Sequence, residues 1–236
     1  MSAMEKKIIG ILGGMGPLAT ADLFQKIILH TRAETDQQHL HVLIDSNTNI
    51  PDRTAALLHG GADPTPELVK SARRLADAGA EVLIMPCNTA HNFHAAVQAA
   101  VDIPVLHMIA LTRDALLACG VRRAALLATD GTVQTGIYQR VFSGSGIDLL
   151  VPEGDDQAAV MDIIYHGVKA GDMAHPTDGF RRCVESLLAR GAETLILGCT
   201  ELPLAFSLYH LDYPVTDPTL ELALGAIRFA GGEVKS

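Results

Sequence analysis

Two nine-residue segments of this 236-residue chain nearly repeat one another, and each ends in a cysteine. Residues 79–87 read GAEVLIMPC and residues 191–199 read GAETLILGC, identical at six of nine positions. Each has the pattern of a glycine turn followed by a short buried strand, with the cysteine where that strand ends. In open parallel sheets, ligands bind beyond the carboxyl ends of the strands. The repeat therefore predicts a duplicated unit with a thiol at two equivalent strand ends.

Strand-like runs recur along the chain and alternate with helical stretches rich in alanine and leucine. We expect strands at residues 8–12, 42–45, 82–85, 105–108, 124–128, 195–197 and near 215. This alternation is typical of parallel sheets with crossover helices. The predicted fold is α/β, with two similar parallel-sheet domains related by internal duplication and an active site in the cleft between them. Such a cleft would place one thiol on each side of a bound molecule.

The duplication extends beyond the cysteine segments. Residues 8–16 (IIGILGGMG) have a looser counterpart in residues 124–132 (AALLATDGT), and both lead into a helix. We place the domain boundary near residue 111 and expect the last helix, residues 219–230, to pack back on the first half. The predicted domains are residues 1–111 with 217–236, which carry Cys87, and residues 112–216, which carry Cys199.

Composition excludes several classes of function. The net charge of −9 argues against nucleic acid or an anionic membrane as a partner. The N-terminus leads into the first strand without the apolar segment of a signal peptide, and no apolar run is long enough to cross a bilayer. Four cysteines without a C-x-x-C motif indicate reduced thiols. We therefore expect a cytoplasmic protein. Because the chain is acidic, binding of a carboxylate ligand would need local cationic residues and backbone N–H groups.

Polar residues follow both repeated cysteines. Asn88 and Thr89 come after Cys87, and Thr200 comes after Cys199, each time before an expected helix start. Helix N-termini can lower the pKa of a thiol and hold a carboxylate, and these side chains add hydrogen-bond donors. A matched pair of thiols suits the removal of a proton from one face of a carbon and its delivery to the other. The alternative is that both cysteines are buried and inert.

Four motifs now carry a specific resemblance. They are GILGGMGP at residues 10–17, IPDRT at 50–54, PCNTAH at 86–91 and LGCTE at 197–201. Together they resemble the aspartate racemase family, within the aspartate/glutamate racemase superfamily, and the likeness covers the whole chain. The resemblance implies an amino-acid racemase that needs no cofactor or metal, with a small amino acid as its substrate and a homodimer as its assembly.

The resemblance also implies roles for individual residues. Cys87 and Cys199 become the opposed acid and base, and the donors that follow them bind the α-carboxylate region. Arg53 and Lys169 match the family's cationic positions near the site, although a surface ion pair with Asp52 and a solvated helix end are the respective alternatives.

Further candidates complete the site. The other expected substrate-binding residues are Met15, Asn47 and Thr129. Glu201 is a candidate to orient or hydrogen-bond a group near the second thiol; otherwise it is a helix-start carboxylate paired only with the helix dipole.

Two departures from glutamate racemase bear on the substrate. That relative is expected to carry Asp-Ser-Gly after its first strand and Cys-Thr-His at its second cysteine, where this chain has GGM at 13–15 and CTE at 199–201. We therefore favour interconversion of L- and D-aspartate. Glutamate or broad-specificity racemisation, or another two-cysteine isomerase or decarboxylase, remains open. So do two other classes of protein, a non-catalytic amino-acid sensor and a redox dithiol protein.

Two weaker motifs point elsewhere. Residues 14–19 fit the G-x-G-x-x-A pattern of dinucleotide-binding loops, but the acidic Asp45 lies later than that pattern requires. Cys87, His91 and His94 have a spacing that zinc ligands can adopt, without a carboxylate to complete the shell. Neither motif explains the duplicated cysteines, so we predict neither a dinucleotide nor a metal.

Overall fold

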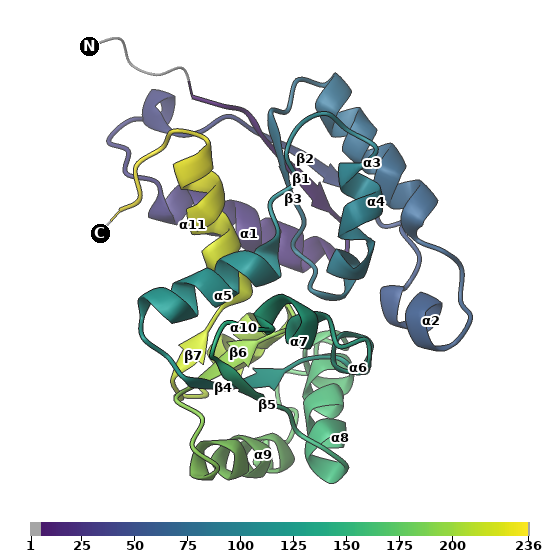
Figure 1. The fold of residues 1–236 in the computed structure, drawn as a ribbon, viewed down its shortest axis with the longest axis vertical. Coiled ribbons are helices and arrows are strands. Elements are labelled where there is room, and N and C mark those ends of the chain that lie inside the picture. Colours follow the sequence, from purple (N-terminus) through teal and green to yellow (C-terminus); the bar gives the residue numbers. More distant parts are fainter. Residues whose placement is uncertain (1–5, 236) are drawn as a thin grey trace. The chain divides into compact units, whose positions relative to one another are not determined.

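The computed structural model describes residues 6–235, which divide into two α/β units. One unit runs to Leu111 and also includes the stretch from Thr219 onward, and the other is Thr112–Pro218. Each unit has its own parallel sheet with helices against it (Figure 1). The expected α/β fold with two parallel-sheet domains is confirmed.

The sheet of the first unit has the strand order β2-β1-β3, and both pairings are parallel. Its strands are β1 (Ile9–Gly13), β2 (Val42–Ser46) and β3 (Val82–Ile84). Its helices are α1 (Pro17–His30), α2 (Arg53–Leu58), α3 (Thr65–Asp77), α4 (His94–Gln98) and α11 (Pro218–Phe229), with 3-10 turns at Asp36–Gln38 and Thr89–Phe93. Helix α5 (Met108–Ala118) begins in this unit.

Strand alternation decides which face of the first sheet each side chain covers. Val82 and Ile84 belong to a cluster with residues of α1 and α11, whereas Leu83 and Met85 belong to a cluster with residues of α3. Cys87 continues the second series and lies in the same cluster. Successive side chains of a strand point to opposite faces, so the cysteine lies on the α3 side of the sheet.

The second unit has the strand order β5-β4-β6-β7, again all parallel. Its strands are β4 (Arg123–Leu127), β5 (Asp148–Leu150), β6 (Thr194–Leu197) and β7 (Val215–Thr216). Its helices are α6 (Asp130–Gln134), α7 (Ile137–Phe142), α8 (Asp155–Asp162), α9 (Asp178–Ala189) and α10 (Leu202–Leu208), with a π-helix at Ile163–Val168. Leu195, Leu197 and Cys199 share one cluster with residues of α8 and α9.

The two sheets repeat one plan down to individual hydrogen bonds. In each unit the cysteine-bearing strand pairs with the unit's first strand, so β3 matches β6. The glutamates of the two repeats make equivalent contacts, because Glu81 accepts the backbone N–H of Ile8 and Glu193 accepts those of Arg122 and Arg123. Each glutamate binds backbone at the start of its unit's first strand, so the glutamate of the repeat has the same structural role in both units.

One expectation about strands was wrong, and one strand was missed. Residues 105–108 form a single bridge between Val105 and Leu83 rather than a strand, and α5 already begins at Met108. His107 accepts a hydrogen bond from the N–H of Ala110 at 3.4 Å, which favours the helix start there. The strand β5 was not anticipated, because it is an edge strand that begins with the exposed Asp148 and lacks the fully buried apolar run that marks the equally short β3. Among the described residues, no helix is long and apolar enough to span a bilayer.

Candidate active site

Cys87 lies at the carboxyl end of β3, as expected for a ligand-facing residue. Its backbone N–H donates to the carbonyl of Met85, and the 3-10 turn begins two residues later at Thr89. Cys87 is 7% exposed, whereas Met85 is completely buried. Asn88 and Thr89 are also buried beside it. The loop thus places polar groups next to a thiol at the edge of an apolar cluster.

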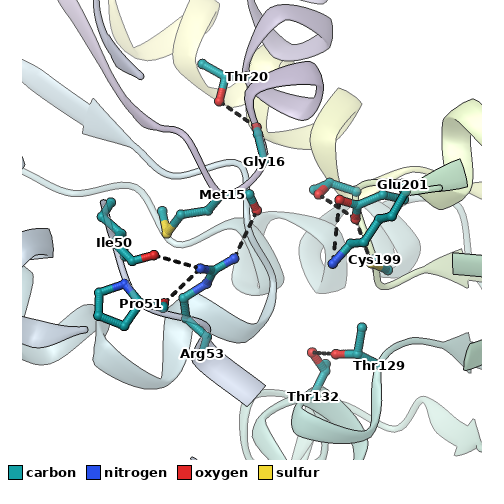
Figure 2. A network of polar contacts seen from close by, with 12 residues as sticks. Met15, Gly16, Thr20, Ile50, Pro51, Arg53, Thr129, Thr132, Cys199 and Glu201 are labelled. Atoms are coloured by element: carbon teal, nitrogen blue, oxygen red, sulfur yellow. Dashed lines mark hydrogen bonds and ion pairs between the residues drawn. The ribbon is translucent and has the colours of Figure 1, made fainter. Parts of the chain in front are cut away.

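Arg53 lies at the start of α2 and holds three backbone carbonyl groups. Its Nη1 donates to the carbonyl oxygens of Pro51 at 2.8 Å and Ile50 at 3.3 Å, and its Nη2 reaches that of Met15 at 3.5 Å (Figure 2). Its Nε is buried and makes no hydrogen bond. Asp52 instead caps α2 by accepting the N–H of Ala55, so the ion pair considered as an alternative is absent here.

The glycine loop after β1 packs against the loop after β2. Gly14 has φ +90°, and a Cβ there would lie 2.4 Å from the backbone of Asn47. The absence of a side chain at Gly14 therefore allows a close approach to this chain's own backbone. Asn47 uses its side-chain amide to donate to Glu67 and Ser71. Because the side-chain nitrogen of Asn47 is used in this way, its predicted contact with substrate would have to be made by Oδ1, and this oxygen already accepts the N–H of Asn49.

His91 makes hydrogen bonds through both ring nitrogens and so has no free nitrogen for zinc. Its Nδ1 lies 2.8 Å from the carbonyl oxygen of Cys87, and its Nε2 accepts the N–H of Met108 at 3.1 Å. His94 uses Nε2 to bond the carbonyl of Val105 at 2.8 Å. Within residues 6–235 there is no group of three or more His, Cys, Asp or Glu side chains placed to hold a metal.

Cys199 lies at the carboxyl end of β6 and donates a hydrogen bond to a carboxylate. Its Sγ is 2.9 Å from Oε2 of Glu201, which also lies 3.4 Å from the Thr200 hydroxyl (Figure 2). Burial foremost, and then the charge of Glu201, raise the pKa of the Cys199 thiol well above its usual value. This is opposite to the expected lowering by a helix N-terminus. Cys199 is therefore held as a thiol.

Lys169 lies near the same carboxylate. Its Nζ is 4.0 Å from Oε1 of Glu201 and 4.3 Å from the ring centroid of Tyr165. The charge of Lys169 opposes the rise in the pKa of Cys199. The π-helix Ile163–Val168 ends just before this lysine, which is only partly exposed. A thiol, a carboxylate and an ammonium group therefore form one chain of contacts in the second unit.

The other candidate residues divide between the units. Met15 is buried in the same apolar cluster as Cys87, and its carbonyl accepts from Arg53. Thr129 precedes α6, and its hydroxyl lies 3.3 Å from that of Thr132 (Figure 2). The structure thus groups Met15, Asn47, Arg53, Cys87, Asn88 and Thr89 in the first unit, and Thr129, Lys169, Cys199, Thr200 and Glu201 in the second.

Cys183 shows what an inert cysteine looks like in this protein. It is completely buried in the core of the second unit, and burial raises its pKa to about 12. Cys87 and Cys199 each keep 7% exposure and stand beside polar groups. All four cysteines are free thiols. The two repeated cysteines therefore differ in environment from a purely structural one.

The residue-by-residue expectations missed two neighbours of the site. Tyr165 was not singled out, although its position four residues before Lys169 on a helix is one at which side chains meet. His91 was considered only as a metal ligand. Its position four residues after Cys87 would place its ring over the cysteine carbonyl, and that spacing was the available signal.

Two α/β units that carry thiols at equivalent strand ends, with polar residues after each thiol, are the features that the sequence linked to racemases. Residues 12–224 match the family described as Asp/Glu/Hydantoin racemase. The chain belongs to this family, and it is thus an isomerase of the racemase type.

Comparisons with individual proteins agree with this assignment. The solved structure of the aspartate racemase of Picrophilus torridus is 33% identical with a TM-score of 0.83, covering 97% of this chain and 96% of that one. The broad-specificity amino-acid racemase RacX of Bacillus subtilis is 26% identical over 93% of this chain and 96% of its own length. The glutamate racemase of Corynebacterium glutamicum is 27% identical, but over only 61% of this chain and 52% of its own.

Proposed function

We propose that this protein interconverts L- and D-aspartate by proton transfer at Cα, with Cys87 and Cys199 as the two acid/base groups. One observation carries this proposal: the thiols occupy the same position in two units that share the strand arrangement β2-β1-β3 and β5-β4-β6. Each follows the strand that pairs with the first strand of its unit, and each belongs to the face formed by the residues two and four positions before it. A duplicated scaffold that presents two equivalent thiols suits a reaction in which a proton leaves one face of a carbon and another proton is added to the opposite face.

In the proposed step, one sulfur begins as thiolate and takes the α-proton, whose bonding electron pair stays on Cα. The other sulfur begins as a thiol and delivers its proton to the opposite face of that carbon. The reaction ends with the inverted amino acid and with the protonation states of the two sulfurs exchanged. Cys199 suits the role of donor in the resting enzyme, because Glu201 and burial keep it protonated. Cys87 would then be the first acceptor.

Arg53 supplies positive charge for the substrate. In the part of the chain that the structure describes, no carboxylate pairs with this guanidinium, and its Nε makes no hydrogen bond. Charge-assisted hydrogen bonds to a carboxylate are among the stronger polar contacts in proteins. We assign Arg53 to a substrate carboxylate, with Lys169, Asn88, Thr89 and Thr200 as further donors. A cation beside the reacting carbon also stabilises the charge that develops as the proton leaves.

Aspartate is favoured over glutamate by the motifs and by the similarity to an aspartate racemase along nearly the whole chain. The second candidate function is a broad-specificity amino-acid racemase, because the similarity to RacX also extends over 93% of this chain, at 26% identity. A panel of acidic, neutral and basic amino acids, read by chiral chromatography, separates the two. Aspartate turnover alone supports the first candidate, and comparable turnover of several side chains supports the second.

The racemisation itself is tested with L-aspartate in deuterated water. We expect D-aspartate that carries deuterium at Cα, while unreacted L-aspartate keeps protium at early times. D-aspartate that retains protium would contradict a path through two acid/base groups.

Two rival classes make different predictions. For an amino-acid sensor, Cys87→Ser and Cys199→Ser would leave ligand affinity unchanged, and the wild-type protein would show no turnover. A redox dithiol protein would form a disulfide readily even with ligand bound, which requires the sulfurs to approach bonding distance. Cytoplasmic location and homodimer assembly remain predictions.

A further inference from the structure

His91 is held in a single tautomer by its two hydrogen bonds. A carbonyl oxygen can only accept, so Nδ1, 2.8 Å from the oxygen of Cys87, must carry the proton. Nε2 is then the nitrogen with a lone pair, and it accepts the N–H of Met108 at 3.1 Å. Both bonds are buried. The ring therefore bridges the loop that bears the first thiol and the beginning of α5.

His91 also stays neutral at physiological pH. Burial foremost, and then the neighbouring His107, lower its pKa to about 3, and the backbone contacts with Cys87 and Leu106 offset this only in part. A group that is neutral across the working range of an enzyme and has both nitrogens occupied does not exchange protons with substrate. Any contribution to the reaction must come through what the ring holds in place.

A hydrogen bond to the Cys87 carbonyl can fix the orientation of the residues around the thiol. It lies in the planar peptide that joins Cys87 to Asn88, so a bond to its oxygen orients the backbone of both residues. At the other end of the ring, the Met108 N–H belongs to the first turn of α5, where helix N–H groups find no partner within the helix. His91 thus connects the peptide after the thiol to the start of a helix.

The second unit does this differently. There the carbonyl of Cys199 accepts the backbone N–H of Leu202 at 3.0 Å, within the turn that begins α10. When the two repeats are superimposed in sequence, His91 falls opposite Pro203, which has no donor. The carbonyl of the second cysteine is thus bonded by a backbone N–H, whereas the carbonyl of the first cysteine is bonded by the side chain of His91.

We propose that His91 is a positioning residue that sets the orientation of Cys87 for proton transfer at Cα. This inference rests on the proposed racemase function. Small displacements matter in such a step, since misplacing a reacting group by about 1 Å can cost about 100-fold in rate.

The chain offers a matched control in His94. Its ring centroid is 5.9 Å from that of His91, and it also bonds a backbone carbonyl, that of Val105. It has no hydrogen bond to Cys87. Replacing either histidine with phenylalanine removes one imidazole from the same stack, but only His91→Phe releases the thiol loop.

Two polar replacements separate the two bonds of His91. The amide nitrogen of asparagine lies near the place of Nδ1, so His91→Asn can still donate to the Cys87 carbonyl. The longer glutamine places its amide near Nε2, so His91→Gln can serve Met108 but not the cysteine. A role in orienting the thiol predicts rescue by asparagine and not by glutamine.

The experiment uses full-length protein with the exposed Cys119 replaced by serine. We expect His91→Phe and His91→Gln to lower kcat for aspartate by about 10- to 100-fold with KM nearly unchanged. His91→Asn and His94→Phe should stay within about threefold of the parent. If His91→Phe loses no more kcat than His94→Phe, the inference is overturned. If the phenylalanine variants fail to fold, equal kcat in the asparagine and glutamine variants overturns it.

A second measurement does not need turnover. The rate at which iodoacetamide alkylates Cys87, followed by peptide mass spectrometry, should change in His91→Phe and His91→Gln and match the parent in His91→Asn. Absence of racemisation by the parent protein would reject the proposed function. The alkylation rates would still show whether His91 governs the thiol, and unchanged rates in all variants would reject the inference itself.

Discussion

Replacing Arg53 tests the assignment of the substrate carboxylate. Its guanidinium has no carboxylate partner within the described residues, and it is held by the carbonyls of Met15, Ile50 and Pro51. A hydrogen bond to a charged group contributes about 1.5–3 kcal/mol, and each 1.4 kcal/mol corresponds to about tenfold. Loss of the contact in Arg53→Met should therefore lower kcat/KM for aspartate by about 10- to 150-fold.

Arg53→Lys refines this prediction. Lysine keeps the charge but loses the planar fork that can hold loop carbonyls and a carboxylate at once. We expect kcat/KM between those of the wild type and Arg53→Met. The assay is initial-rate racemisation followed by polarimetry or chiral chromatography, with urea unfolding to confirm that each variant is folded.

Arg73→Met is the matched control. Arg73 is also in the first unit and donates to a backbone carbonyl, that of Ala100 at 3.4 Å, so its loss changes the net charge equally. We expect its kcat/KM to remain within about threefold of the wild type. Equal values of kcat/KM in folded Arg53→Met and Arg73→Met would refute the assignment of Arg53 to substrate.

Two further predictions concern the second thiol and the glycine loop. Glu201→Gln removes a negative charge and a strong acceptor beside Cys199, so the pKa of this thiol should fall and its alkylation by iodoacetamide should begin at lower pH. Lys169→Met removes a positive charge that lowers this pKa, so the pH profile of Cys199 alkylation should shift to higher pH. An unchanged profile in both variants would contradict the contacts described here. Gly14→Ala places a Cβ 2.4 Å from the backbone of Asn47. The control is Gly79→Ala, because Gly79 also has positive φ but a Cβ there meets nothing within 4 Å. We expect Gly14→Ala to lower the free energy of unfolding by about 1–3 kcal/mol more than the control does. Equal urea midpoints of the two alanine variants would exclude that steric conflict.

Local sequence was sufficient for the features that depend on short-range periodicity. The repeated Gly-Ala-Glu segments identified β3, β6 and the cysteines that follow them, because turn, strand and strand end lie within nine residues. Asn88 and Thr200 are the next residues after these segments, and their role as substrate donors stays a prediction. The strand β5 was missed because it begins with an exposed aspartate and lacks the fully buried apolar run of β3, which has the same length.

Features that depend on a side-chain torsion or on contacts between distant segments could not be decided from the sequence. The orientation of Glu201 toward Cys199 rather than into its own helix start depends on a side-chain torsion. The lowered pKa of His91 depends on burial beside His107, sixteen residues away in sequence. Sequence could supply the candidate residues, but it could not determine which protonation states their surroundings impose.

The central claim is that the two thiols serve opposite faces of one carbon, and single-thiol variants test it most directly. Cys87→Ser and Cys199→Ser are each incubated with L-aspartate and with D-aspartate in deuterated water, and α-deuterium is measured by mass spectrometry. We predict that both variants lose racemisation, and that each exchanges the α-proton of one enantiomer only, with opposite preference in the two variants. Exchange of the same enantiomer by both variants, or continued racemisation by either, would contradict the account.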